Sequence, residues 1–414
     1  MNFLYNISAQ ITFFFLRIVA QFNPKMKLFI QGRKEAFSKL SELSGHNNVI
    51  WFHAASLGEF EQGRPVIEAI KREYPTRKIL VTFFSPSGYE IQKDYELADV
   101  VCYLPFDTKR NVKKFVNVVQ PELAIFIKYE FWPNLLNELN AKSIPAILVS
   151  GIFRKDQSFF KSYGAWFRKT LKTFDHFFVQ DVASKELLEN IKCSNVSVSG
   201  DTRFDRVFEI LQQDNRLDFV EKFKDGKYTM VAGSTWSEDE HLFVSYINKE
   251  ASENEKFIIA PHNMNEKAIR LLKESIHKKT VLFSEKEGKT LEDYQVLIVD
   301  TVGLLTKVYS YADAAYVGGG LSSNGVHNIL EPATFGIPVV IGNYYSKFKE
   351  AVDLVALKGC ISIKDQSSFS TIFIQLKTDR DFRGKTGAIN RKYVEENIGA
   401  TSMIMSYISK QLNT

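Results

Sequence analysis

Residues Gly318–Gly342 read GGGLSSNGVHNILEPATFGIPVVIG and carry the pattern that decides the fold. They follow an apolar run, Ala314–Val317, with the character of a buried strand, so the three glycines stand where this strand must turn sharply. A polar loop, a short helix from Ile329 to Phe335 and a second apolar run, Val339–Ile341, come next. The order strand, loop, helix, strand predicts one unit of a parallel sheet.

The same stretch has features of a ligand site. A glycine-rich turn places no side chain between its backbone and a neighbour, so we expect another group to approach closely there. Glu331 and Pro332 fall in the first turn of the predicted helix, and free backbone N–H groups at such a start favour an anion. In open parallel sheets, ligands bind at the carboxyl ends of strands. The alternative is tight packing within an α/β protein.

The order of the short motifs in this stretch, GGG, then HN, then EPA, then GIP, is more specific than a glycine-rich turn alone. It resembles the nucleotide-sugar half of GT-B glycosyltransferases, and within them the transferases of 3-deoxy-D-manno-octulosonic acid (Kdo) in lipid A synthesis. The resemblance implies that Asn328, Ile329, Leu330 and Glu331 hold the nucleotide of the donor.

Length and composition indicate a globular protein of two domains. The 414 residues are too many for one ordinary core, and 45% hydrophobic with 24% charged residues is the balance of a globular chain. The cysteines, Cys102, Cys193 and Cys360, are far apart and odd in number, so they indicate neither a disulfide framework nor a metal cluster. This usage fits a reducing compartment, and we interpret the three as small buried side chains.

The net charge of +5 is concentrated near the start of the sequence. Residues 1–50 contain six basic and two acidic residues, a net charge of +4. No basic helix with base-stacking residues indicates nucleic-acid binding. The local excess points to an anionic membrane surface or an anionic acceptor.

The segment Phe3–Phe22 predicts a helix with one apolar face. Its apolar residues recur at steps of three and four: Leu4, Ile7, Ile11, Phe14, Phe15, Ile18 and Phe22. A membrane span needs ~20 residues nearly free of polar groups, whereas this segment contains Arg17 and several amides. It also lacks the leading basic residues and the cleavage site of a signal peptide. We therefore expect a helix in the membrane interface; a short single span and a helix packed only on its own protein are the alternatives.

In the first half, an apolar strand pattern, Val49–His53, runs into the small residues of AASLGE. Glu59 thus falls at a strand-to-helix junction, where a carboxylate is placed to accept a proton from a hydroxyl group. An ordinary helix-capping carboxylate is the alternative. The run HAASLGE resembles the N-terminal signature of the Kdo transferases, whose catalytic base is the glutamate of that motif. The resemblance assigns that role to Glu59 and places Ser56 on the acceptor side.

Glu130 follows another predicted strand, Leu123–Ile127, of the same half. Two carboxylates at neighbouring strand ends can act together, one as a base and the other orienting the acceptor or tuning its partner's pKa. The family usually has an ETE sequence before Trp-Pro-Asn. Here Lys128 and Tyr129 stand in the first two places, so only Glu130 carries over. Arg154, just after a fourth strand, is expected on the acceptor side.

The second half repeats the strand-and-turn pattern, with loops that suit a phosphate. Gly233, Ser234 and Thr235 follow the predicted strand 228–232, and Pro261 and His262 follow another. Val302, Gly303 and Leu304 form a third turn. The resemblance assigns all three turns to CMP. The chain departs from the family at Trp236, where His is frequent, at His262, where Arg is common, and at Leu304, where Glu is frequent.

These observations predict an α/β protein of the GT-B type, with two Rossmann-like parallel-sheet domains facing across a cleft and an N-terminal membrane-associated helix. The expected divisions are a membrane-interface helix and basic segment 1–44, an acceptor domain 45–205, a linker 206–226, a CMP-sugar domain 227–395 and a C-terminal helix 396–414. For the C-terminal helix 396–414, we consider an arrangement in which it packs back on the first domain.

The resemblance spans about residues 45–355 and implies inverting transfer of Kdo from CMP-Kdo to a lipid A precursor, at the cytoplasmic side of the inner membrane. We predict no cofactor and no metal, because no Asp-x-Asp pair presents itself as a clamp and a single phosphate can leave against helix N-termini and hydrogen-bond donors. No nucleic-acid partner is expected. Three other interpretations remain: a GT-B enzyme with a UDP-sugar and a lipid-linked acceptor, a sugar-nucleotide epimerase, and a non-catalytic nucleotide binder.

Overall fold

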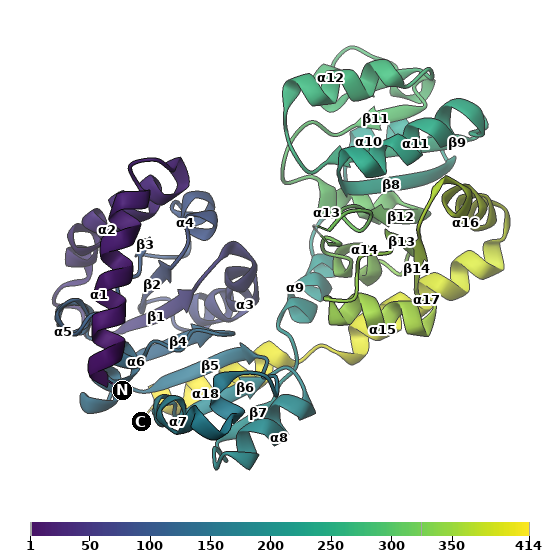
Figure 1. Cartoon of the computed structure of the whole chain (residues 1–414). Helices are drawn as coiled ribbons and strands as arrows, with labels where there is room; N and C mark the ends of the chain where they lie inside the picture. The colour runs from purple at the N-terminus through teal and green to yellow at the C-terminus, as the bar shows by residue number, and fades with distance from the viewer. Residues whose placement is uncertain (1, 324, 414) are drawn as a thin grey trace. The chain divides into compact units, whose positions relative to one another are not determined.

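The computed structural model describes residues 2–323 and 325–413. The chain divides into two compact units: Met1–Asp205 with Ile398–Thr414, and Arg206–Asn397. Each unit is built around its own seven-stranded sheet (Figure 1), and every strand pairing in both sheets is parallel. The predicted α/β fold with two Rossmann-like parallel-sheet domains is therefore confirmed.

The sheet of the first unit has the strand order β3-β2-β1-β4-β5-β6-β7. All six residues of the central strand β1 are buried, because helices cover both faces of the sheet. Alternate residues enter separate cores: Trp51 belongs to one, while Ile50 and Phe52 belong to the other. The strands are β1 (Val49–Ala54), β2 (Lys78–Phe83), β3 (Val100–Tyr103), β4 (Leu123–Ile127), β5 (Ala146–Gly151), β6 (His176–Val179) and β7 (Val196–Val198).

The helices of the first unit divide between the two cores. Buried residues of α2, α5, α6, α7 and α8 join the Trp51 core, and those of α3, α4 and α18 join the Phe52 core. The helices are α1 (Asn2–Val19), α2 (Pro24–Leu40), α3 (Leu57–Glu73), α4 (Pro86–Gln92), α5 (Lys109–Val119), α6 (Pro133–Ala141), α7 (Ala165–Leu171), α8 (Val182–Asn190) and α18 (Ala400–Leu412).

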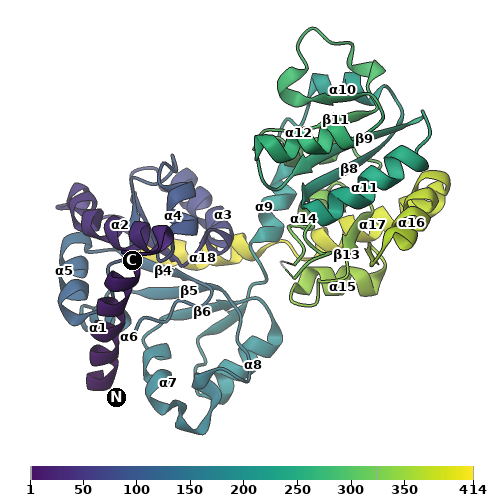
Figure 2. The same cartoon turned by 45° about the horizontal axis from the view of Figure 1, so that its top comes forward.

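Helix α18, drawn in yellow, lies with the first unit although it comes last in the chain (Figures 1 and 2). Its buried Ile404, Met405 and Ile408 belong to the same core as α3. The carboxylate of Asp205 accepts hydrogen bonds from the backbone N–H groups of Gly399 and Thr401, at 2.5 and 2.7 Å, and so caps the start of α18.

Helix α1 has one face on the first unit and one face exposed. Tyr5 Oη donates a hydrogen bond to Asp107 Oδ2 at 2.7 Å, and the Phe13 ring contacts Phe106 at a centroid distance of 4.2 Å. The other face carries exposed large apolar side chains, including Phe14 at 62% and Phe15 at 59%. Within residues 2–323 and 325–413, no helix is long and apolar enough to cross a membrane.

The second sheet has the order β10-β11-β9-β8-β12-β13-β14. Buried side chains of α11, α12 and α16 pack in one core with residues of its central strands. The strands are β8 (Tyr228–Thr235), β9 (Glu255–Pro261), β10 (Thr280–Leu282), β11 (Val296–Ile298), β12 (Ala314–Val317), β13 (Val339–Gly342) and β14 (Cys360–Ile363). The helices are α9 (Arg203–Glu209), which spans the division between the units, α10 (Asp218–Lys224), α11 (Ser237–Lys249), α12 (Glu266–Ser275), α13 (Leu305–Val308), α14 (Leu330–Thr334), α15 (Lys349–Leu357), α16 (Gln366–Thr378) and α17 (Arg380–Glu396).

The expected linker 206–226 is not a free connection. Its helix α10 buries Val220 and Phe223. Lys224 Nζ donates to the Tyr311 carbonyl oxygen at 2.8 Å and pairs with Asp313 Oδ2 at 2.9 Å. The segment therefore packs as part of the second unit.

Candidate functional site

Glu59 lies in the first turn of α3, directly after β1. Ser56 occupies the N-cap position, and Glu59 Oε2 accepts a hydrogen bond from the backbone N–H of Ala55 at 2.6 Å. Burial raises the pKa of Glu59 to about 7, with the negative charge of Glu130 as the next contribution. Glu59 thus has a capping role, and it also has the pKa of a carboxylate that can exchange protons near neutral pH.

Glu130 lies just beyond β4, within reach of two donors. Its Oε2 is 2.9 Å from His53 Nε2 and accepts a hydrogen bond from Trp132 Nε1 at 2.7 Å. His53, on β1, is fully buried. His53 and Trp132 lie within the two motifs, but sequence reasoning assigned their side chains no role. Only their contact with Glu130 distinguishes them from ordinary core residues.

The tautomer of His53 follows from its contacts. Its Nδ1 is 3.0 Å from the carbonyl oxygen of Thr82, which can only accept, so we assign a proton to Nδ1. Nε2 faces the Glu130 carboxyl, and one proton is needed to make that 2.9 Å contact a hydrogen bond. Trp132 Nε1 also lies 3.2 Å from His53 Nε2, so the indole, the imidazole and the Glu130 carboxyl group form one hydrogen-bonded cluster.

Lys128 and Tyr129 interact electrostatically with Glu59, and Arg154 interacts with Tyr129. Lys128 has a left-handed backbone with φ of 69°, and its charge is one of those that lower the pKa of Glu59. Burial raises the pKa of Tyr129, the charge of Arg154 lowers it and the charge of Glu59 raises it. The structure thus brings Arg154 into the electrostatic environment of Tyr129, and Tyr129 into that of Glu59.

Gly58 lies beside Glu59 in the first turn of α3. It is a helical residue of α3 without a positive φ, so the turn itself does not require glycine. A Cβ atom built there would meet nothing within 4 Å. Gly58 therefore leaves open space beside Glu59.

The three glycines at the end of β12 are explained by contacts within the second unit. A Cβ on Gly318 would lie 2.3 Å from the Ser234 carbonyl oxygen, and one on Gly320 would lie 2.9 Å from the backbone nitrogen of Gly342. Gly319 has a φ of 90°, which other residues rarely adopt. The close approach expected at this turn is thus made by the chain's own backbone.

Glu331 is the centre of a polar cluster at the start of α14. Its Oε1 accepts from Asn328 Nδ2 at 3.0 Å and its Oε2 from Thr306 Oγ1 at 2.8 Å. Burial lowers the pKa of Arg206, and the nearby charge of Glu331 raises it. Sequence reasoning missed Thr306 and Arg206, which lie far from the HNILEP motif. Leu330 is buried, and its backbone N–H donates to Asn328 Oδ1 at 3.1 Å, so Asn328 also supplies a partner for a backbone N–H at the start of α14.

Asp239 joins the β8 and β12 turns. Its Oδ2 accepts from the backbone N–H groups of Trp236 and Gly319, both at 2.9 Å, and its Oδ1 accepts from Tyr316 Oη at 2.5 Å. In the sequence, Asp239 is only the middle residue of the acidic run 238–240, so nothing there distinguishes it. Gly233, in the same region, packs against Tyr309, whose hydroxyl oxygen would lie 1.9 Å from a Cβ on that glycine.

Three aromatic side chains of the second unit lie against one another: Trp236, His262 and His327. The ring centroid of His262 is 4.8 Å from that of Trp236 and 4.3 Å from that of His327. Trp236 Nε1 donates to His327 Nε2 at 2.9 Å. Two of these residues are positions at which the chain departs from the family pattern, and the structure places them in contact.

The remaining predicted nucleotide residues lie at other points of the second unit. Val302 is 78% exposed and precedes Gly303, which has a φ of 89°, while Leu304 is the N-cap of α13. Ser234 has a left-handed φ of 53°. Ile329 is buried as the N-cap residue of α14.

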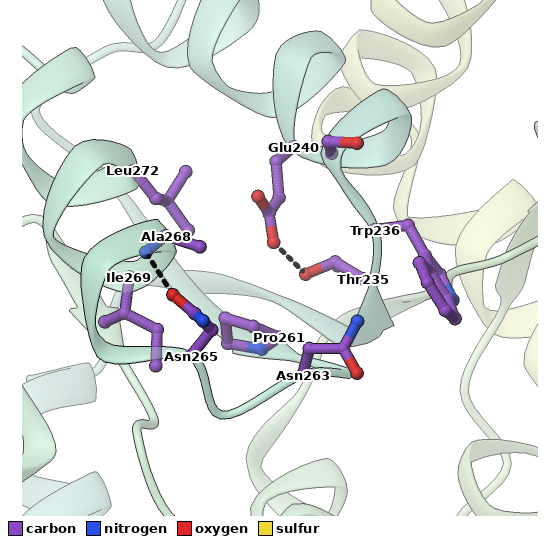
Figure 3. Close-up of a pocket in the computed structure, with 10 residues that line it drawn as sticks. Thr235, Trp236, Glu240, Pro261, Asn263, Asn265, Ala268, Ile269 and Leu272 are labelled. Atoms are coloured by element: carbon purple, nitrogen blue, oxygen red, sulfur yellow. Dashed lines mark hydrogen bonds between the residues drawn. The ribbon is translucent and has the colours of Figure 1, made fainter. Parts of the chain in front are cut away.

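Thr235 and Pro261 line a cavity of about 210 Å³ between the starts of α11 and α12 (Figure 3). In the close-up, Glu240 and Thr235 point toward each other, with a hydrogen bond of 3.1 Å, and Ile269 and Leu272 form the opposite wall. The Trp236 ring lies on the far side of Thr235 from that wall.

Within the described part of the chain, no group of three or more His, Cys, Asp or Glu side chains is arranged to hold a metal ion. The three cysteines are free and buried, and burial raises the thiol pKa of Cys102 to about 12.

Known proteins resemble the chain over both units. Residues 31–206 match the family model described as 3-deoxy-D-manno-octulosonic-acid transferase (kdotransferase). A 3-deoxy-D-manno-octulosonic acid transferase of Aquifex aeolicus is 28% identical over 88% of this chain and 96% of its own length. A bifunctional glycosyltransferase/methyltransferase of Fusobacterium nucleatum is also 28% identical, but the match spans 77% of this chain and only half of that relative.

The fold is also that of solved structures. The UDP-GlcNAc 2-epimerase of Neisseria meningitidis superposes with a TM-score of 0.59 at 16% identity, covering 87% of this chain and all of that one. Two parallel-sheet units of this kind, together with the sequence matches, define a glycosyltransferase of the GT-B type. Within that class, residues 31–206 match the 3-deoxy-D-manno-octulosonic-acid transferase family, and the Aquifex transferase of that description extends the similarity over 88% of the chain.

Proposed function

We propose that this glycosyltransferase transfers Kdo from CMP-Kdo to a hydroxyl group of a lipid A precursor, with inversion at the anomeric carbon. The observation that carries the chemistry is Glu59, a half-buried carboxylate with its pKa raised to about 7, beside the second carboxylate of Glu130. The names of the family and of its Aquifex relative support Kdo as the sugar.

The proposed reaction is a single displacement. The acceptor hydroxyl oxygen forms a bond to the anomeric carbon of Kdo while the bond from that carbon to the phosphate oxygen breaks. CMP leaves with the electron pair, and the hydroxyl proton passes to Glu59. A base with a pKa near 7 suits this step, because it is substantially ionised at neutral pH and still strong enough to take a proton.

We assign Glu130 the supporting role on the acceptor side. Its hydrogen bonds to His53 and Trp132 fix its orientation, and its charge raises the pKa of Glu59. Ser56 and Arg154 complete the predicted acceptor set. The open space at Gly58 supports approach of an acceptor to the first turn of α3.

The nucleotide is proposed to bind to the second unit without a metal. Hydrogen-bond donors then stabilise the leaving phosphate. The proposed set comprises Gly233–Thr235, Pro261, Val302–Leu304 and Asn328–Glu331. His262, which the sequence also predicted, is assigned no contact with the donor, because its ring is stacked on Trp236 and His327. Full activity after exhaustive treatment with a chelator is the expected result, and activity restored only by a divalent cation would contradict this part.

We also propose that the protein is peripheral to the cytoplasmic face of the inner membrane. The exposed apolar face of α1 and the net charge of +4 on residues 1–50 support this placement. The anionic head groups would pair with the basic residues while the apolar side chains enter the interface.

The deciding experiment incubates the purified full chain with a lipid A precursor in detergent and with CMP-Kdo, UDP-N-acetylglucosamine or no donor. Mass spectrometry of the lipid should show the added mass of Kdo with CMP-Kdo alone. Addition of a sugar from the UDP donor would favour the alternative transferase, and epimerisation of UDP-N-acetylglucosamine would favour an epimerase.

A further inference from the structure

Trp236 and His327 form one flat surface in the second unit. The two rings are inclined by only 7°, and their centroids are 6.3 Å apart. The indole Nε1–H donates to His327 Nε2 at 2.9 Å, so the rings meet edge to edge rather than face to face. Trp236 follows β8 and His327 follows β12, so two separate turns at the carboxyl edge of the sheet supply the surface.

The backbone behind this surface is firmly held. Asp239, 1% exposed, accepts hydrogen bonds from the N–H groups of Trp236 and of Gly319. The Gly319 position packs against the His327 ring, since a Cβ there would lie 3.0 Å from His327 Cδ2. The backbone N–H of His327 donates to the Gly318 carbonyl oxygen at 3.1 Å. Both rings are therefore fixed before any ligand arrives, as a stacking surface requires.

His262 covers one face of the surface. Its ring is inclined by 21° to Trp236 and by 24° to His327, at centroid distances of 4.8 and 4.3 Å. These distances are those of stacked rings, so a further ring cannot stack on this face without displacing His262. His262 is exposed and lies on the turn after β9, where its side chain can move toward solvent.

The surface carries no charge near neutral pH. Burial and, to a smaller extent, the neighbouring His262 together lower the pKa of His327 to about 4. Burial also lowers the pKa of His262. A neutral aromatic surface suits the flat face of a base, whereas it offers a phosphate no fixed cation.

We propose that the cytosine base of the donor stacks on the Trp236–His327 surface in the place of the His262 ring, which swings aside. This inference rests on the proposed function, because the proposed donor identifies the base as cytosine. In this arrangement Trp236 and His327 bind the base. The His262 ring competes with the base for the same face of the surface and does not act as a cation for the phosphate.

The test uses the full chain labelled with 5-fluorotryptophan and observed by ¹⁹F NMR. The chain has four tryptophans, and a Trp236→Phe variant assigns the Trp236 signal. Cytidine and CMP should both shift that signal, and inorganic phosphate should leave it in place. A Trp166→Phe variant, altered in α7 of the first unit, is the matched control and should bind like the wild type.

Affinity measurements complete the test. Trp236→Leu should weaken cytidine binding roughly 5- to 150-fold, the range expected for loss of stacking on one ring. His262→Ala should bind cytidine as tightly as the wild type or more tightly. Two results together would overturn stacking on the Trp236–His327 surface: unchanged CMP affinity in Trp236→Leu, and a Trp236 signal that CMP does not shift in the wild type. The assignment of CMP-Kdo as the donor would remain.

Failure of the proposed function gives a different pattern. If UMP shifts the Trp236 signal and CMP does not bind, the donor is wrong, and cytosine as the base is overturned with it. If His262→Ala abolishes binding of cytidine, His262 is itself a binding residue and its role as a competitor is overturned. Circular dichroism of each variant confirms that the fold is retained.

Discussion

His53 Nε2 lies 2.9 Å from Glu130 Oε2, and this contact joins the end of β1 to the residue that follows β4. On the other side of the ring, His53 Nδ1 lies 3.0 Å from the Thr82 carbonyl oxygen, so both ring nitrogens have a partner. The contact determines how much negative charge Glu59 experiences from its neighbouring carboxylate. The first three predictions concern this group of residues.

We predict that Glu59→Gln lowers turnover by ~10²–10⁴-fold, the usual contribution of a general base, while CMP affinity is unchanged. In the wild type, kcat should rise with pH through a midpoint of about 7, because only the ionised Glu59 can accept a proton. Single-turnover rates between pH 5 and 9 measure both effects. Near wild-type turnover in Glu59→Gln, with an inactive Glu130→Gln, would move the role of base to Glu130.

Burial of Glu59 also has a consequence for stability. Its pKa in the folded state is above the ordinary value of 4.5, so the folded protein binds its proton more strongly than the unfolded chain does. This contribution to stability is fully present below the unfolded pKa and is lost as pH rises to about 7. We predict that Glu59→Gln loses less stability than the wild type between pH 5 and 8, by on the order of 2–3 kcal/mol. Urea unfolding at the two pH values tests this, and parallel changes in both proteins would contradict the raised pKa.

His53→Asn should shift the midpoint of the pH–rate profile to higher pH. The charge of His53 is one of the contributions that lower the pKa of Glu59, and its removal leaves Glu130 less compensated. Stability should also fall, by ~1–3 kcal/mol, because a buried polar partner is lost. Phe52→Leu, in the opposite core, is the control: it should lower stability without moving the midpoint. If the midpoint of the pH–rate profile is unchanged in His53→Asn, His53 contributes only packing and does not affect the pKa of Glu59.

Gly58→Ala should stabilise the protein while impairing catalysis. Alanine is favoured over glycine inside a helix by about 0.5–1 kcal/mol, and its methyl group would meet nothing within 4 Å in the free protein. We expect the KM for the lipid acceptor to rise while CMP affinity stays unchanged. Gly384→Ala in α17, which also has open space at Cβ, should stabilise the protein without altering KM. An unchanged KM for the acceptor in Gly58→Ala would show that the acceptor does not approach the first turn of α3 at Gly58.

The Asn328→Ala, Glu331→Ala double variant should lose most CMP binding in isothermal titration. These side chains hydrogen-bond to each other, so their effects should not add independently. Thr306→Val, which removes the other donor to Glu331, should have a smaller effect of the same sign. Undiminished CMP binding by the double variant would exclude the start of α14 as the nucleotide site.

Substitution of Phe3, Phe14 and Phe15 by serine should abolish binding to vesicles that contain phosphatidylglycerol and leave the fold intact. These side chains lie on the exposed face of α1, whereas Tyr5 and Phe13 contact the first unit. Flotation with vesicles measures binding. A protein without residues 1–24 should likewise remain folded, with stability reduced by the loss of the Tyr5 and Phe13 contacts. If it unfolds, α1 belongs to the core of the first unit.

The strands were predictable because parallel sheets bury both faces and so leave continuous apolar runs, such as Val49–His53 and Val339–Ile341. The carboxylates at strand ends were predictable for the same reason. Partners from distant segments were not predictable. The sequence indicates only that Asp239 lies at the start of a helix, and its hydrogen bond with Gly319 forms only in the folded chain. The glycines of the β12 turn were visible, but the sequence could not show that Ser234 and Gly342 are the groups that approach them.

The position of helix α18 at the end of the chain affects how the first unit folds during synthesis on the ribosome. The apolar side chains of α18 complete a core whose other residues all precede Asp205, and about 190 residues of the second unit are made in between. At ~5–20 residues per second, this interval lasts roughly 10–40 s. The first unit of the nascent chain therefore exposes an uncovered apolar strip while the second unit is synthesised. A chaperone that shields such a strip would act in that interval.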